Sequence, residues 1–194
     1  MRIGAFLLFA PPDVTFDRLN FANQDQTVAA FVQRIEGFYL RPAHDLAGLR
    51  HAFACGVLCC TAIDALARYE NHREARDIRF TAWIADHIPD LRTPPLAKRF
   101  HEDFRHGLVH EGRVKNGGQF SFDTAEAVVA EDGVLIVNPS YLLPPIRSGL
   151  HAFATRLLSD HAHYRGFVQL LEREFRAELA TTGGLRDAQS RQTR

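Results

Sequence analysis

The residues best suited to chemistry lie in the segment 99–112, which holds Arg105, His106 and His110 and ends in Gly112. A guanidinium is always charged and can hold a phosphodiester through two parallel hydrogen bonds. An unperturbed imidazole titrates near neutrality, so it can take a proton from a ribose 2′-hydroxyl or give one to a leaving oxygen. The arginine can also stabilise the charge that builds on phosphorus. These groups together predict metal-independent cleavage of RNA that leaves a cyclic phosphate.

Two other interpretations of the segment stay open. Histidines four residues apart are common on amphipathic helices, and the helix dipole alone favours an arginine near a helix C-terminus. The other interpretation is a zinc site, because His101-Glu102 resembles the start of the motif H-E-x-x-H. The next histidine, His106, comes one residue too late for that motif. His106 and His110 could supply two ligands, and no third is evident nearby. We therefore expect neither a metal nor a cofactor.

Helical periodicity surrounds this segment. Thr93 followed by two prolines is a typical helix start, and Gly112 is a typical stop, so the segment should end one helix. A helix that starts near Thr27 should close at Gly37 and Pro42. A longer helix over residues 44–69 is apolar nearly all round, which predicts a central, buried position. Two more helices are expected over residues 73–87 and 145–179, the last with a bend near Gly166.

A change of period marks an inserted β-hairpin near residues 119–138, where Asp132-Gly133 suits a two-residue turn. Residues 1–25 are expected to form an irregular arm, and residues 184–194 a flexible polar tail. The chain is thus predicted to be a single domain over residues 1–194. Its fold class is mainly α, a helical bundle with one hairpin.

Composition narrows the class of protein. A chain of 194 residues that is 46% hydrophobic can bury one sizeable core. Lys plus Arg and Asp plus Glu each number 23, so the total charge does not indicate a strongly basic nucleic-acid-binding surface, although a local basic site remains open. Cys55, Cys59 and Cys60 crowd into one apolar segment without a zinc-binding spacing, which favours buried thiols in a reducing compartment.

Targeting signals are weak in this sequence. The apolar run 3–10 is short and is followed by Pro11-Pro12 where a signal peptide has small residues at its cleavage site. No segment approaches the roughly 20 apolar residues that span a bilayer. We therefore expect a cytoplasmic protein that does not bind a membrane.

The segment Phe104–Gly112 resembles the signature of the HEPN superfamily (higher eukaryotes and prokaryotes nucleotide-binding domains), in particular Apea/Abi-like HEPN domains. That signature is an arginine, a polar residue, three to five further residues and a histidine that a glycine frequently follows. His106 takes the polar position and His110 the last one. Residues 60–66, CTAIDAL, resemble an earlier helix of the family, in which an acidic residue stands where Asp64 stands here. The resemblance covers roughly residues 44–112.

The resemblance implies a helical bundle that pairs across its motif helices, so that two copies form one composite RNA-cleaving site in a homodimer. Arg105 would bind the scissile phosphate, His110 would be the general acid or base, and His106 would assist. Asp64 would orient Arg105 by a charge-assisted hydrogen bond, unless it merely faces water or caps a neighbour.

Two functions follow from this resemblance. The first is a HEPN-like endoribonuclease related to toxin–antitoxin or phage-defence systems, with RNA as substrate and a cognate antitoxin or other partner protein. The alternative is a non-catalytic HEPN-like module for binding or dimerisation, whose ligand is a partner protein, RNA or nucleotide. Neutral overall charge mildly favours the second function, because a general nuclease usually has a basic face.

Overall fold

The computed structural model describes residues 2–3, 6–75 and 78–192. The described chain is mainly helical, which confirms the predicted class. Eight α-helices are found in it: α1 (Gln24–Ile35), α2 (Arg41–Gly48), α3 (Ala52–Glu70), α4 (Arg79–His87), α5 (Pro94–Arg99), α6 (Gly107–Glu111), α7 (Leu143–Ser159) and α8 (His161–Gln192). A π-helical turn, Glu36–Leu40, joins α1 to α2, and another, Phe100–His106, joins α5 to α6. Short 3₁₀ turns cover Phe16–Arg18, Pro89–Leu91 and Pro139–Tyr141.

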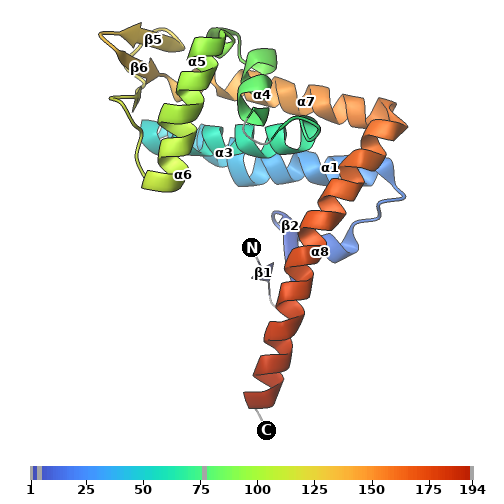
Figure 1. Cartoon of the computed structure of the whole chain (residues 1–194). Coiled ribbons are helices and arrows are strands. Elements are labelled where there is room, and N and C mark those ends of the chain that lie inside the picture. The colour runs from blue at the N-terminus through green and yellow to red at the C-terminus, as the bar shows by residue number, and fades with distance from the viewer. Residues whose placement is uncertain (1, 4–5, 76–77, 193–194) are drawn as a thin grey trace.

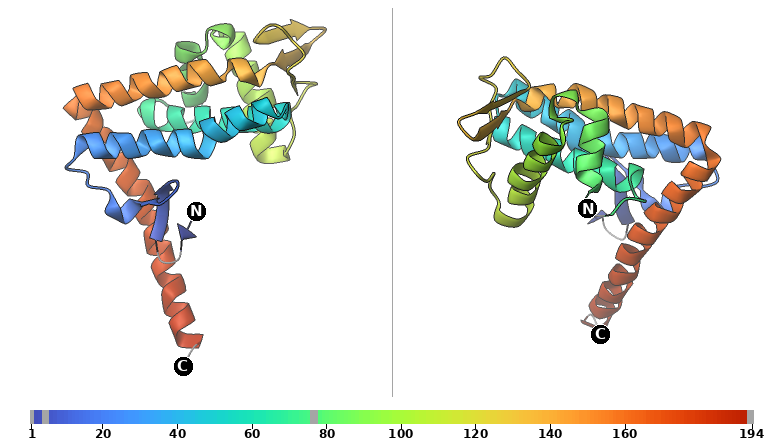
Figure 2. Two further views of the ribbon diagram at one scale, coloured as in Figure 1. Left: turned by 180° about the vertical axis from the view of Figure 1, so that it is seen from behind. Right: turned by 45° about the horizontal axis from the view of Figure 1, so that its top comes forward.

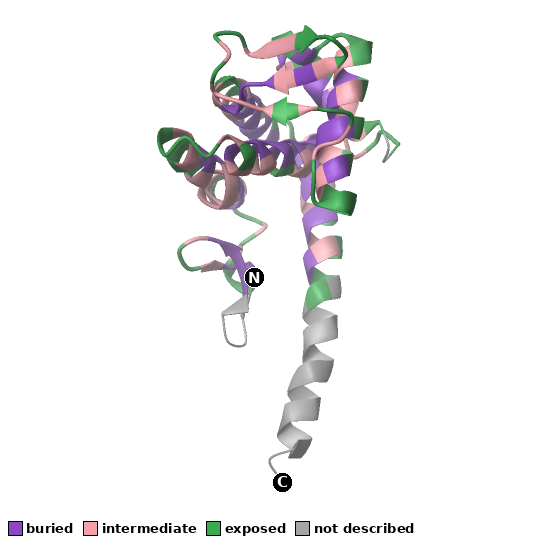
Figure 3. Cartoon of the chain, turned by 90° about the vertical axis from the view of Figure 1, so that its left-hand side faces the viewer, coloured by how far each residue is buried: buried purple, intermediate pink, exposed green. Residues whose placement is uncertain are grey.

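The long helices α1, α3 and α7 form the body of the molecule, and α4 and α5 cover one end of it (Figures 1 and 2). Helix α3 contacts α2, α4, α7 and α8. Ile63 and Leu66 of α3 are completely buried, and buried residues lie along the helices of the body (Figure 3). The expected central position of this apolar segment is therefore confirmed.

Within the described residues, α3 is the one helix long and apolar enough to cross a membrane by length and composition, which the sequence analysis did not anticipate. Half of its 18-residue apolar window is buried inside the structure, and a core helix meets the same criterion.

The first helix does not end at Gly37 and Pro42 as predicted. It continues through the π-helical turn Glu36–Leu40 into α2, because a wider turn accommodates the proline that a regular helix interior excludes. The chain breaks instead at Arg50, whose φ of 58° is left-handed, and the His51 amide donates to the Leu46 carbonyl at 2.9 Å. This closure splits the predicted helix 44–69 in two. The break was not predicted because glycine, rather than arginine, usually takes the left-handed position at a helix end.

The last predicted helix is also two helices. The break lies at Asp160, where the side-chain oxygen Oδ1 accepts hydrogen bonds from the amides of Ala162 (2.8 Å) and His163 (3.0 Å). This aspartate caps the start of α8, so the expected bend near Gly166 is wrong. The helical backbone of α8 covers residues 184–192 of the predicted flexible tail, and residues 193–194 lie outside the described residues.

The expected irregular arm contains a three-stranded antiparallel sheet, β1 (Arg2–Ile3), β2 (Phe6–Ala10) and β3 (Val14–Thr15). It is ordered by packing rather than by its own sequence pattern. The rings of Phe16 and Phe175 stack with centroids 4.9 Å apart, and the Arg34 guanidinium lies 5.3 Å from the centre of the Phe9 ring. These contacts hold the arm between α1 and α8.

The predicted hairpin is confirmed. Strands β5 (Val128–Glu131) and β6 (Val134–Val137) pair antiparallel around Asp132 and Gly133, both with positive φ. A short strand β4 (Gln119–Phe120) pairs parallel with β6. The sheet packs closely on α3, because a Cβ on Gly56 would lie 2.5 Å from the Phe120 ring.

A buried carboxylate ties α3 to α4 and α7. Glu70 Oε2 accepts from Trp83 Nε1 at 2.8 Å and lies 3.2 Å from His87 Nε2, and its Oε1 lies 3.2 Å from Arg156 Nη2. The Glu70 side chain is only 3% exposed. Because such a carboxylate is stable only with its partners, this cluster fixes how the three helices meet.

Replacing Glu70 by alanine should therefore lower the free energy of unfolding by about 2–4 kcal/mol, because it leaves the Trp83 N–H without an acceptor. Urea unfolding followed by circular dichroism measures this. Glu70→Gln keeps an acceptor for Trp83 and should cost less. Glu172→Ala, which breaks an exposed pair with Arg176, is the control and should change stability by less than about 0.5 kcal/mol. Equal effects of Glu70→Ala and Glu172→Ala would contradict the assigned role.

Candidate functional site

The structure brings Asp64, Arg105, His106 and His110 to one cavity of about 750 Å³, here called the site cavity. Four elements build it: α3, the first turn of α4, the motif helix (α5, the turn Phe100–His106 and α6 in continuous succession) and α8. The lining residues are Asp64, Ala67, Arg68, Arg79, Phe80, His101, Arg105, His106, His110, Leu170, Arg173 and Glu174.

Asp64 and Arg105 form a two-pronged ion pair across this cavity. Arg105 Nε donates to Asp64 Oδ1 at 3.0 Å, and Nη2 donates to Oδ2 at 3.2 Å. The Arg105 side chain is 22% exposed and that of Asp64 is 45% exposed, so water still reaches the pair. The charge-assisted contact expected between Asp64 and Arg105 is therefore present, and Asp64 does not merely face water. The pair orients Arg105 more than it stabilises the fold.

The π-helical turn Phe100–His106 explains how arginine and histidines reach the same cavity. In a regular helix Arg105 would point away from His110. In a π-helical turn residues five apart, rather than four, lie above one another. The His101 and His106 ring centroids are consequently 6.5 Å apart, and those of His106 and His110, across the return to regular helix, are 4.4 Å apart. Such turns are frequent at functional sites, and periodicity alone did not predict this one.

His101 is a cavity residue whose place in the site sequence reasoning missed, since it was considered only as part of a zinc motif. Its ring is half-buried and lies 5.3 Å from the ring of Phe80. Burial lowers the pKa of His101, and the nearby positive charges of Arg105 and His106 lower the pKa further. Neutral imidazole is therefore the favoured form at neutral pH.

Arginines from other elements complete the site, and no local pattern pointed to them. Arg68 pairs with Glu174, whose other oxygen accepts from the Tyr69 hydroxyl at 3.0 Å. Arg79 donates to the backbone carbonyls of His72 and Glu74, both at 2.9 Å. Arg173 is exposed on α8. Four arginines thus line the cavity with two carboxylates, so a neutral chain has a locally positive site.

Metal binding receives no support from the described part of the chain, where no group of three or more His, Cys, Asp or Glu side chains is arranged to hold an ion. The three cysteines are buried in α3, as expected, and their thiols are free.

The loop after α6 folds back onto the motif helix at Gly107. The Lys115 amide donates to the Asp103 carbonyl at 2.8 Å, and a Cβ on Gly107 would lie 2.5 Å from the Arg113 carbonyl oxygen. Gly112, with a φ of 66°, makes the turn that starts this loop. Glycine at position 107 therefore permits the close return of the chain beside His106.

Gly107→Ala should lower the free energy of unfolding by about 1–3 kcal/mol, because the new methyl group meets backbone that has little room to move. The matched control is Gly48→Ala in α2, where nothing lies within 4 Å of the new Cβ. That change should raise stability by roughly 0.5 kcal/mol through helix propensity. Chemical unfolding of both variants measures the difference, and a Gly107→Ala protein as stable as Gly48→Ala would refute the close contact.

The lowered pKa of His101 predicts a dependence of stability on pH. The unfolded chain binds a proton at this histidine near pH 6.5, whereas the folded chain binds it only at lower pH. The contribution of neutral His101 to the free energy of unfolding is therefore fully present above about pH 6.5. It is lost as the pH falls below that value. Asp64 and Glu102 oppose this effect but do not reverse it.

His101→Gln should lose less stability than the wild type between pH 7.5 and pH 5.5 in urea unfolding experiments. His163, whose pKa is also lowered by burial, remains in both proteins. The stability of His101→Gln should therefore still fall with pH, but less steeply than that of the wild type. Identical losses in the two proteins would show that His101 is not held neutral.

Comparisons of the chain with models of protein families, with curated proteins and with solved structures gave no match. The function is therefore inferred from the side chains, their geometry and the resemblance of the motif.

Proposed function

We propose that the protein is a HEPN-like, metal-independent endoribonuclease that acts as a homodimer. The observation that carries this proposal is the arrangement of four side chains at the site cavity. Asp64 holds Arg105 through two hydrogen bonds, and the rings of His106 and His110 lie at the same cavity. A fixed guanidinium beside exposed imidazoles is the combination that cleavage next to a ribose 2′-hydroxyl requires.

The reaction is an internal displacement at phosphorus. One histidine takes the proton of the 2′-hydroxyl while its oxygen attacks the phosphorus, and the bond to the 5′-oxygen breaks. A second imidazole gives that oxygen a proton, so the products are a 2′,3′-cyclic phosphate and a free 5′-hydroxyl. His110 is assigned as a general acid or base, with His106 assisting. Arg105 offers its remaining donors to the phosphate oxygens, on which negative charge builds during attack.

The surroundings of the cavity favour a polyanion as substrate. Arg79 and Arg173 reach the cavity from α4 and α8, outside the motif. Their charges attract a phosphate backbone although the chain as a whole is neutral. The neutral total charge of the chain is therefore compatible with a nuclease, because arginines are in excess at the cavity itself.

The proposed homodimer would pair through the exposed end of the motif helix. His110 is exposed, and the neighbouring Val109 is an apolar side chain that is 62% exposed. Pairing across α6 would cover Val109 and bring two sets of histidines to a shared cleft, as the HEPN resemblance implies. A toxin or phage-defence role, a cognate antitoxin and a cytoplasmic location belong to the same proposal.

The test is cleavage of single-stranded RNA by the purified protein in excess EDTA. Arg105→Ala and His110→Ala should each reduce the rate by about 100-fold or more, because each removes a group that acts on the transition state. Asp64→Asn should reduce it less, since one acceptor for Arg105 remains. The products should carry cyclic phosphate ends.

Two control variants match these changes away from the cavity. Arg147 forms an equivalent two-pronged pair with Glu36, at 2.7 and 3.2 Å, and His151 is exposed on α7. Arg147→Ala and His151→Ala should cleave at the wild-type rate. Activity that survives in both Arg105→Ala and His110→Ala comes from a contaminant and overturns the enzyme proposal. A dimer that binds RNA or nucleotide without cutting it would be the non-catalytic module.

A further inference from the structure

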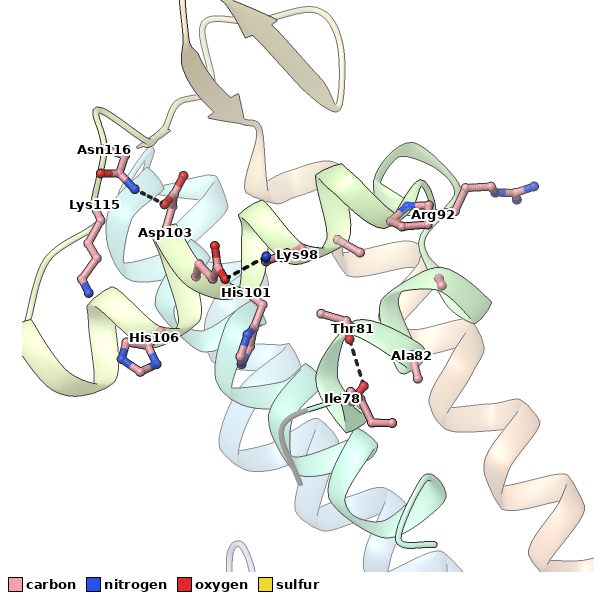
Figure 4. Close-up of a pocket in the computed structure, with 14 residues that line it drawn as sticks. Ile78, Thr81, Ala82, Arg92, Lys98, His101, Asp103, His106, Lys115 and Asn116 are labelled. Carbon is pink, nitrogen blue, oxygen red and sulfur yellow. Dashed lines mark hydrogen bonds and ion pairs between the residues drawn. The ribbon is translucent and has the colours of Figure 1, made fainter. Parts of the chain in front are cut away.

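A second cavity, of about 910 Å³, adjoins the site cavity along the motif helix. It is bounded by α4, the motif helix and the loop after α6. Figure 4 shows Ile78, which precedes α4, and Thr81 of α4 across from His101.

The two cavities meet at two side chains, His101 and His106, which line both. A ligand that occupies one cavity can therefore continue into the other across these rings. His106 is exposed and His101 is half-buried. Because the pKa of His101 is lowered, its ring presents an uncharged flat face at neutral pH. Histidine rings are among the side chains on which unstacked RNA bases pack.

The floor of the second cavity is made of the short side chains of Ala82 and Ala97, and Ala85, which is exposed, lines the cavity as well. Thr81 uses its hydroxyl within the protein, because it donates to the Ile78 carbonyl at 3.0 Å. The floor is thus apolar. The volume of the cavity is within the range of pockets that hold small organic ligands. A flat aromatic ring suits this space better than a strongly hydrated group does.

Positive side chains also line this cavity, those of Arg92, Lys98 and Lys115. Lys98 is 72% exposed and lies 3.8 Å from Glu102, a loose pair that a phosphate can displace. The buried Asp103 carboxylate accepts hydrogen bonds from Arg99 and Asn116, so its charge is compensated within the protein. An anion at the mouth of the cavity therefore meets Lys98 without a competing free carboxylate from Asp103.

We infer that the second cavity binds the nucleoside next to the scissile phosphate. Its base packs against His101 over the alanine floor, and its outer phosphate is held near Lys98. This inference deepens the proposed function, on which it rests, because it makes the substrate a strand of at least two nucleotides and gives the enzyme a subsite that holds one base. The strand then crosses His101 and His106 between the two cavities.

The test is titration of the full-length protein with each of the four nucleoside 5′-monophosphates, and separately with ribose 5-phosphate, followed by isothermal calorimetry. At least one nucleotide should bind about tenfold or more tightly than ribose 5-phosphate, because only the nucleotide carries a base. Ala85→Phe fills the cavity from an exposed position and should weaken nucleotide binding about tenfold or more. Lys98→Ala should weaken it by a smaller factor of about three to ten.

Matched controls lie on α7 and α8. Ala152→Phe places the same ring at another exposed helical alanine, and Arg176→Ala removes the cation of another exposed pair with a residue four positions away. Neither should change nucleotide binding, and circular dichroism checks that every variant is folded. Equal binding of ribose 5-phosphate and nucleotides, or nucleotide binding that Ala85→Phe leaves unchanged, overturns the inference.

Failure of the subsite is distinguishable from failure of the enzyme proposal. RNA cleavage that depends on Arg105 and His110, with a KM that Ala85→Phe does not alter, rejects the subsite alone. Nucleotide binding that Ala85→Phe abolishes in a protein that never cuts RNA supports the binding cavity and rejects only the catalysis.

Discussion

The ion pair between Asp64 and Arg105 is the contact on which the candidate site depends. Asp64 stands on α3, which is buried along much of its length and cannot move without disturbing the core. Its carboxylate accepts two hydrogen bonds from the Arg105 guanidinium. The Arg105 side chain is therefore held in one orientation by a helix that is itself fixed in the core. A free arginine would lose rotational entropy on binding phosphate, whereas this one has already lost most of it.

The π-helical turn in the motif helix has an equally direct consequence. It changes which residues share a face, so Arg105, His101 and His106 all reach the site cavity, and His110 joins them where the helix becomes regular. The cost is a local departure from ideal helix geometry. The packing of Phe100 and Phe104, both completely buried, holds the turn in place. Local irregularity maintained by a well-packed core is typical of sites that act on ligands.

Positive charge is concentrated at one cavity although the chain as a whole is neutral. Lysine and arginine equal aspartate and glutamate in number, yet arginines from α3, α4, the motif helix and α8 converge on one cavity. A second, largely apolar cavity adjoins this one along the motif helix, and His101 and His106 line both. An extended ligand with charged links and flat rings, such as an RNA strand, matches this alternation of positive and apolar surface.

The sequence by itself determined the mainly helical class, the hairpin at Asp132-Gly133, the buried course of α3 and the cluster around Arg105, because periodicity, turn chemistry and residue type are local properties. Only the tertiary structure decided what depends on distant partners. It showed that Asp64 meets Arg105, that the chain breaks at Arg50 and Asp160, and that arginines of α4 and α8 join the site. Such contacts join residues far apart in the chain, and no local pattern encodes them.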